Sequence, residues 1–248
     1  MKKLGLIGYP LGHSFSKKYY LDKFTDEGIQ HIHYDLYPIA DIADFKREIL
    51  TDKSFYGVNV TIPYKQSVIP YLDELSPEAD EMEAVNCIRI RHTEDGKLHV
   101  KGYNTDAYGF EMSLKPLLKP HHKKALIFGN GGATKAVCYT LRKLGINYQI
   151  VSRSKGDQTI TYQDLTTALI QQHTLLINCS PVGTFPNITE APNIPYGGIT
   201  ADHLLYDLIY NPEQTQFLTL GKQQGASIKN GYEMLVLQAE KNWEIWNQ

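Results

Sequence analysis

The stretch ALIFGNGGATKA, residues 125–136, decides the fold of the second half of this chain. Its apolar start is typical of a buried strand, glycines then interrupt the pattern, and helix-forming residues follow. In this setting a glycine at 129 permits a tight turn, a glycine at 131 lets a pyrophosphate approach the backbone, and the helix N-terminus offers amide donors. The alternative is a glycine-rich turn without a ligand. The stretch predicts a dinucleotide-binding turn formed by Gly129, Asn130, Gly131, Gly132 and Ala133.

Strand and helix patterns alternate on both sides of this turn, which favours an α/β fold over a bundle or a sandwich. We expect two domains: an N-terminal α/β substrate domain over residues 1–105 and a Rossmann-like dinucleotide-binding domain over 106–230. The run 231–248 follows as an amphipathic helix. Predicted strands cover residues 4–8, 31–39, 57–62, 84–91, 125–129, 148–153, 173–180 and 204–210, and predicted helices cover 19–24, 42–50, 134–145 and 212–225.

Composition excludes several classes of function. The net charge is −2, from 25 Lys and Arg against 27 Asp and Glu, so no basic field predicts nucleic acid or a membrane as a partner. Three cysteines lie far apart without a CxxC pair, which favours a reduced, cytoplasmic protein without structural zinc. No apolar run approaches the ~20 residues of a membrane helix. His31 and His33 share a strand face but lack a third ligand, so we expect no metal.

Two further segments carry chemistry. GVNVTIPYK, residues 57–65, reads as a strand that breaks at Pro63 and ends on Lys65. GYNTDAYG, residues 102–109, places Asp106 between glycines. A lysine and an aspartate that meet over a hydroxylated substrate could relay a proton. A surface lysine after a turn is the alternative interpretation.

Six motifs in one order resemble those of the shikimate dehydrogenases, nearly from end to end of the chain. The resemblance implies a two-domain fold in which the last helix, residues 231–248, packs back on the first domain. It also implies reversible, NADPH-dependent reduction of 3-dehydroshikimate to shikimate, in aromatic amino-acid and chorismate biosynthesis. The motifs are HSFS at 13–16, NVTIPYK at 59–65, AVNC at 84–87, NTD at 104–106, GNGGA at 129–133 and NGYEMLVLQA at 230–239.

The resemblance also implies roles for single residues. Lys65 would be the catalytic acid and base, with Asp106 as its partner. Ser14 and Ser16, in extended geometry, could face one carboxylate, although a helix cap is the alternative for two serines in a turn. The remaining substrate-binding residues would be Thr61, Asn86, Tyr210 and Gln238, and Leu208 and Gly231 would contact the cofactor.

The cofactor preference follows from the end of the strand at 148–153. An NAD enzyme usually places an acid there, whereas this chain has Ser152, Arg153 and Ser154, which suit the 2′-phosphate of NADP. The family usually carries a second basic residue on a following helix, and this chain is shorter there, with Lys155 to Asp157 directly after the motif.

Three functions stay open at this point. The first is an NADP-dependent shikimate dehydrogenase, as a monomer or a homodimer, with a small-molecule substrate. The second is a quinate/shikimate dehydrogenase that uses NAD. The third is a catalytically silent nucleotide-binding regulatory module, which would be expected to lose the lysine or the aspartate.

Overall fold

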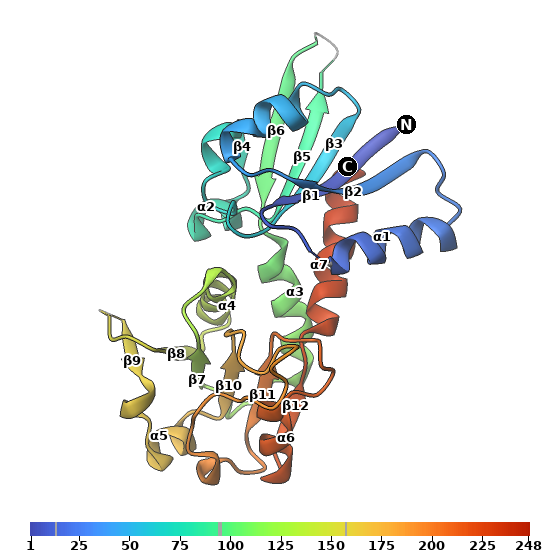
Figure 1. Cartoon of the computed structure of the whole chain (residues 1–248). Coiled ribbons are helices and arrows are strands. Elements are labelled where there is room, and N and C mark those ends of the chain that lie inside the picture. Colours follow the sequence, from blue (N-terminus) through green and yellow to red (C-terminus); the bar gives the residue numbers. More distant parts are fainter. Residues whose placement is uncertain (13, 94–95, 157) are drawn as a thin grey trace. The chain divides into compact units, whose positions relative to one another are not determined.

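The structure, a computed structural model, describes residues 1–12, 14–93, 96–156 and 158–248 (Figure 1). The chain forms two compact units, one of Met1–Asp106 with Gln238–Gln248 and one of Ala107–Leu237. The chain passes from the second unit back to the first within the final helix, α7 (Tyr232–Trp246). From the sequence we expect a substrate domain at 1–105 with 231–248 and a dinucleotide domain at 106–230. These functional assignments stay a prediction.

A mixed six-stranded sheet forms the centre of the first unit. Its order is β2-β1-β3-β5-β6-β4. Strands β1, β2 and β3 are parallel, the β3–β5 and β5–β6 pairs are antiparallel, and β4 joins β6 in parallel. The strands are β1 (Lys2–Gly8), β2 (Ile32–Pro38), β3 (Phe55–Val60), β4 (Glu74–Leu75), β5 (Cys87–His92) and β6 (Leu98–Tyr103), with helices α1 (Phe15–Asp26) and α2 (Pro77–Met82).

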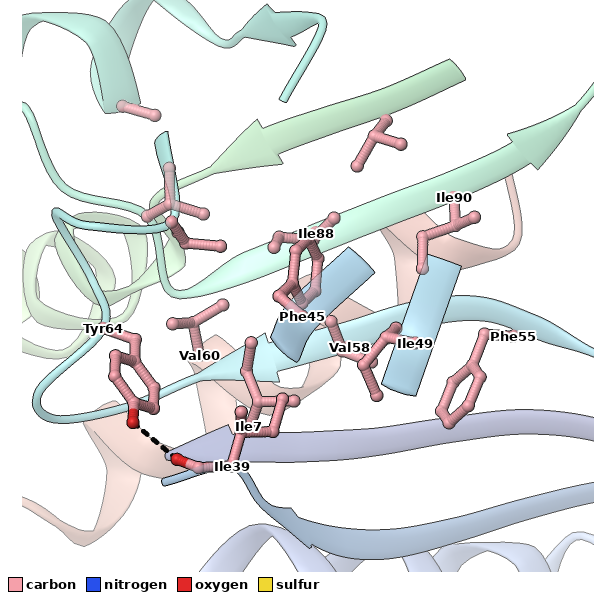
Figure 2. Close-up of a cluster of buried hydrophobic side chains, with 14 residues drawn as sticks. Ile7, Ile39, Phe45, Ile49, Phe55, Val58, Val60, Tyr64, Ile88 and Ile90 are labelled. Carbon is pink, nitrogen blue, oxygen red and sulfur yellow. Dashed lines mark hydrogen bonds between the residues drawn. The ribbon is translucent and has the colours of Figure 1, made fainter. Parts of the chain in front are cut away.

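One face of this sheet is covered by short helical turns, in place of the longer helix that the sequence predicts over 42–50. The observed turns are Ile42–Asp44 and Lys46–Leu50. Figure 2 shows the aromatic and aliphatic side chains that fill the layer, and the dashed bond from the Tyr64 hydroxyl to the Ile39 carbonyl. The buried members of this layer include Ile7, Phe45, Ile49, Val58, Val60, Ile88 and Ile90.

The other face is covered by α1 and the C-terminal half of α7. Trp246 donates from Nε1 to the Ile88 carbonyl at 3.0 Å. Its ring lies so close to Gly57 that a Cβ there would be 2.2 Å from the indole, so β3 requires glycine at this point. Tyr20 of α1 donates to the Ala239 carbonyl at 2.8 Å. These contacts attach residues 238–248 to the first sheet.

Six parallel strands form the sheet of the second unit, in the order β12-β11-β10-β7-β8-β9. Alternate residues of the buried strands face two separate apolar layers, one with α3 and α4 and one with α5 and α6. The elements are α3 (Thr105–Leu114), β7 (Lys124–Phe128), α4 (Gly132–Lys143), β8 (Asn147–Ser152), β9 (Thr159–Thr161), α5 (Thr167–Gln172), β10 (Leu175–Asn178), β11 (Leu204–Asp207), α6 (Gln216–Gln223) and β12 (Ser227–Lys229).

The strand order reverses direction between β7 and β10, with β8 and β9 on one side and β11 and β12 on the other. In doubly wound sheets, ligands bind at the carboxyl ends of the strands at such a switch point. The expected α/β fold with a Rossmann-like second part is therefore confirmed. Over the described residues, no helix is both long enough and apolar enough to cross a membrane.

Candidate active site and dinucleotide pocket

Lys65 and Asp106 form an ion pair in the first unit. The Lys65 Nζ atom lies 2.5 Å from Oδ2 of Asp106, and the two side chains are only 21% and 15% exposed. Lys65 belongs to the turns that follow β3, and its carbonyl accepts from the Val85 amide at 2.7 Å. Asp106 lies in the first turn of α3. The sequence placed these residues 41 positions apart, and the fold brings them together.

Asn86 connects this pair to its surroundings. Its Nδ2 donates to Oδ1 of Asp106 at 2.8 Å and to Oε1 of Gln238 at 3.1 Å. Its Oδ1 accepts from the Thr105 amide at 2.7 Å. Asn86 is 3% exposed, so its orientation is fixed by these partners rather than by water. The two oxygens of Asp106 are therefore held separately, one by Lys65 and one by Asn86.

Gln238 and Asn242 extend the network onto α7, one helical turn apart. Both side chains are buried, at 8% and 1% exposure, although the sequence alone allowed Gln238 to be a solvated polar residue. The Thr105 hydroxyl donates to Oδ1 of Asn242 at 2.6 Å. The buried face of α7 also contains Met234, Ala239, Ile245 and Trp246, while Leu235 and Trp243 are half-buried.

The two serines occupy different kinds of backbone. Ser14 is extended and caps α1, where its hydroxyl accepts from the Lys17 amide at 3.3 Å. Ser16 lies in the first turn of α1, so the expectation that both serines share one extended segment is wrong, because the cap starts the helix at Phe15. His13, the first residue of that motif, lies outside the described residues.

A chain of polar groups nevertheless links Ser16 to Asn86. Ser16 interacts with the Tyr34 hydroxyl, which donates to Oδ1 of Asn59 at 2.9 Å. Asn59 in turn donates to the Asn86 carbonyl at 3.2 Å. Burial raises the pKa of Tyr34 well above its usual value, and the interaction with Ser16 only partly opposes this shift. The first unit therefore assembles neutral donors and acceptors around one ion pair.

Thr61 and Tyr210 come from two further segments, the turn after β3 and the loop after β11. The Thr61 amide donates to the Ile7 carbonyl at 3.0 Å, and its methyl group lies against Gly8. Tyr210 belongs to the second unit and is 39% exposed in the segment after β11.

The second unit contains a pocket of about 1110 Å³ at the carboxyl ends of its central strands. Gly129 adopts a φ of +111° there, which favours glycine. A Cβ on Gly131 would meet nothing within 4 Å, so the backbone is open to a ligand at the start of α4. The pocket is lined on its polar side by Gly129, Asn130, Gly131, Ser152, Arg153, Ser154 and Lys155.

The charge of this pocket suits a phosphate group. Among the described residues that line it, Arg153 and Lys155 are cationic and none is acidic, with Asp157 lying outside the described residues. An arginine fork and nearby hydroxyls bind phosphate oxygens. Other lining residues are apolar, among them Ile150, Val182 and Pro192. The residues present therefore fit a dinucleotide that carries an additional phosphate.

Four other residues that the sequence assigned to the cofactor are not among the pocket-lining residues. Gly132 and Ala133 form the first turn of α4. Leu208 is half-buried against the apolar layer of the second sheet. A Cβ on Gly231 would be 2.0 Å from the Leu208 carbonyl oxygen, so close packing of two backbones explains this glycine.

The structure also adds residues that the sequence reasoning missed. Asn59 and Thr105 lie within the quoted motifs. Asn242 follows Gln238 by one helical turn on a buried face, so all three residues could have been identified from the sequence. Tyr162, Ser180, Ala191 and Asn193 line the pocket from strand ends and loops without such a signal.

The fold and the pocket together define a dinucleotide-binding α/β protein with a separate polar site around a lysine–aspartate pair. A family model described as the shikimate dehydrogenase substrate binding domain matches residues 6–88. The shikimate dehydrogenase (NADP(+)) of Halothermothrix orenii is 38% identical over 264 residues, covering 98% of this chain and 90% of that protein. The one from Clostridium beijerinckii is 38% identical, covering 100% and 93%.

Solved structures agree with these relatives. Shikimate 5-dehydrogenase from Thermus thermophilus, crystallised with NADP(H) and shikimate, superposes with a TM-score of 0.83 at 28% identity, covering 99% of this chain and 93% of that one. This chain belongs to the shikimate dehydrogenase family.

Proposed function

We propose that this protein catalyses the reversible, NADPH-dependent reduction of 3-dehydroshikimate to shikimate. The observation that carries this proposal is the ion pair of Lys65 and Asp106, 2.5 Å apart and surrounded by buried hydroxyl and amide groups. A nucleotide-binding module without turnover would have no use for such a pair. Two relatives whose alignments cover 98% and 100% of this chain are named shikimate dehydrogenase (NADP(+)).

Lys65 performs the proton step in this proposal. When bound, NADPH supplies a hydride to the ring carbonyl carbon. The Lys65 ammonium gives a proton to the carbonyl oxygen as negative charge develops there, and solvent later restores that proton. In the reverse direction the neutral amine removes the hydroxyl proton. Asp106 holds the Lys65 side chain in place through the 2.5 Å bond.

The substrate is held by groups that both give and accept hydrogen bonds. Thr61, Asn86 and Gln238 would bind the ring hydroxyls, because neutral amides and hydroxyls suit a polyol. The hydroxyls of Ser14 and Ser16 would bind the substrate carboxylate from the start of α1, with Tyr210 as a further contact.

The cofactor is NADP in this proposal. Arg153 would bind the 2′-phosphate between Ser152 and Ser154, and the turn of Gly129, Asn130, Gly131, Gly132 and Ala133 would bind the pyrophosphate at the N-terminus of α4. Leu208 and Gly231 would border the nicotinamide. Among the described residues, no group of three or more His, Cys, Asp or Glu side chains could hold a metal ion.

The alternatives separate in one experiment. Initial rates with shikimate and with quinate are measured with NADP⁺ and with NAD⁺. The proposal predicts preference for shikimate and NADP⁺. Preference for NAD⁺ with comparable rates on quinate would instead identify a quinate/shikimate dehydrogenase, and tight NADP⁺ binding without turnover a regulatory module. The protein would act in the cytoplasm. It would be a monomer or a homodimer, and light scattering, which measures the molar mass in solution, distinguishes the two.

A further inference from the structure

Asp207 is a fully buried carboxylate at the end of β11, and the proposed chemistry does not use it. Its Oδ1 accepts from Nδ2 of Asn178 and from the Ile209 amide, each at 3.0 Å. Its Oδ2 accepts from the Thr215 hydroxyl at 2.6 Å. A buried carboxylate is costly unless donors compensate for the lost water, and here three donors surround it.

Asn178 links this carboxylate to the dinucleotide pocket. It lies at the end of β10, where its Oδ1 accepts from the Ser180 amide at 3.0 Å and from the Ser180 hydroxyl at 2.7 Å. Its Nδ2 also donates to the Val182 carbonyl at 3.3 Å. Ser180 and Val182 both line the pocket. The pocket wall at 180–182 is therefore held by one amide side chain.

The ionised Asp207 stabilises the same orientation of that amide as the Val182 carbonyl and the Ser180 amide do. A carboxylate without a proton only accepts hydrogen bonds, so the Asn178 amide must present its NH₂ group to Asp207 and its oxygen to Ser180. The reverse orientation would bring two acceptors together at Asp207 and two donors together at Ser180.

We propose that Asp207 is a positioning residue for the dinucleotide: its ionised carboxylate orients Asn178, and Asn178 holds the Ser180–Val182 wall in its binding conformation. This inference rests on the proposed function, because it concerns the same NADP pocket. It assigns no contact between Asp207 and the ligand.

Proton uptake by Asp207 weakens this control. Burial raises the pKa of Asp207 to about 6, against the opposing bonds from Thr215, Ile209 and Asn178. A proton on Oδ2 reverses the bond with the Thr215 hydroxyl, and the neutral carboxyl group then accepts from Asn178 more weakly than the carboxylate does. Cys179 and Tyr196 are titratable groups that interact electrostatically with Asp207. Burial raises the pKa of both, so neither carries a charge near neutral pH.

The experiment measures the dissociation constant of NADP⁺ by calorimetry from about pH 5 to pH 8 for the wild type and Asp207→Asn. The exposed Asp202→Asn is the matched control. The 2′-phosphate itself titrates near pH 6, but this contribution cancels when two proteins are compared with the same ligand. We expect Asp207→Asn to weaken binding roughly tenfold at the alkaline end and to equal the wild type at the acidic end.

A ratio that is the same at every pH would overturn the proposal, because a merely structural loss does not follow the charge of Asp207. If Asp207→Asn does not fold, Thr215→Val serves instead. It removes the 2.6 Å bond that lowers the Asp207 pKa, so the midpoint of NADP⁺ binding should move to higher pH, and an unchanged midpoint refutes the inference. A wild type that binds no NADP⁺ would refute the proposed function instead.

Discussion

The Lys65 ammonium and the Asp106 carboxylate meet at 2.5 Å, and the second oxygen of Asp106 is held by Asn86 at 2.8 Å. Because each oxygen of Asp106 has its own partner, the plane of the carboxylate is fixed. Lys65 therefore has a defined position even though it lies in a turn. Precise placement of a proton donor is what distinguishes a catalytic lysine from a surface one.

Replacing Asp106 tests this placement. Asp106→Asn keeps the shape but removes the charge that holds Lys65, so we expect kcat for shikimate oxidation to fall about 10²-fold. Steady-state rates with saturating NADP⁺ measure the effect. Glu111→Gln, on the same helix as Asp106, breaks an ion pair with Lys143 of α4, and it is the control that should retain activity. Equal kcat values for wild type and Asp106→Asn would remove Asp106 from the mechanism.

Asn242 supports the same site from α7. Asn242→Leu leaves the Thr105 hydroxyl without its 2.6 Å acceptor in a buried environment. We expect a loss of about 1–3 kcal/mol in the free energy of unfolding, together with a lower kcat, because Thr105 positions Asn86. Urea denaturation and kinetics measure the two effects, with the exposed Asn247→Ala as control. Unchanged stability and unchanged kcat would show that the network does not extend to Asn242.

Short motifs in the sequence predict the pair of Lys65 and Asp106, since each residue ends a motif with its own local pattern. The fold brings the two side chains to 2.5 Å, while their catalytic roles stay a prediction. The backbone of Ser16 was not predictable in the same way. The cap at Ser14 starts the helix at Phe15, whereas an extended Ser16 would require the helix to start at residue 17 or later.

Two residues of the hydrogen-bond networks were not predicted from the sequence. Asn242 could have been inferred from its position one helical turn after Gln238, whereas Asp207 acts through Asn178, 29 positions away, and no local pattern predicts that contact. The short helical turns over 42–50 also departed from the expected helix. There the tertiary packing of Phe45 and Ile49, both fully buried, takes precedence over helix propensity.

Arg153 determines the cofactor preference in this account. Arg153→Ala removes the guanidinium that suits a 2′-phosphate, so the ratio of kcat/KM for NADP⁺ over NAD⁺ should fall by about 10- to 100-fold. The rate with NAD⁺ should change little. Lys222→Ala, an exposed lysine on α6, is the control. If the ratio is unchanged in Arg153→Ala, another residue selects the phosphate.

His122 makes stability depend on pH. Its Nδ1 accepts from the Lys119 amide at 3.0 Å, and its Nε2 contacts the Asp202 carbonyl at 3.1 Å, which requires the neutral ring. Burial lowers the His122 pKa in the folded state. The unfolded chain therefore binds the proton more tightly, and this contribution to stability is lost as the pH falls below the unfolded value of about 6.5.

Thermal unfolding of the wild type and His122→Gln between about pH 5 and pH 8 measures this contribution. We expect the difference in melting temperature to shrink as the pH falls. Asp207 acts in the opposite direction, because its raised pKa gives stability at low pH that is lost as the pH rises through about 6. That contribution is common to both proteins and cancels in the difference. A difference that is constant with pH would show that His122 does not titrate in this range.

The most direct measurement of the central claim is shikimate-dependent reduction of NADP⁺ by the wild type and by Lys65→Ala, followed by the absorbance of NADPH. The account predicts turnover by the wild type and a loss of about 10²- to 10⁴-fold in kcat for the variant, with NADP⁺ binding retained. The exposed Lys53→Ala should behave as the wild type. Equal kcat values for wild type and Lys65→Ala, or no turnover by folded wild-type protein, would contradict it.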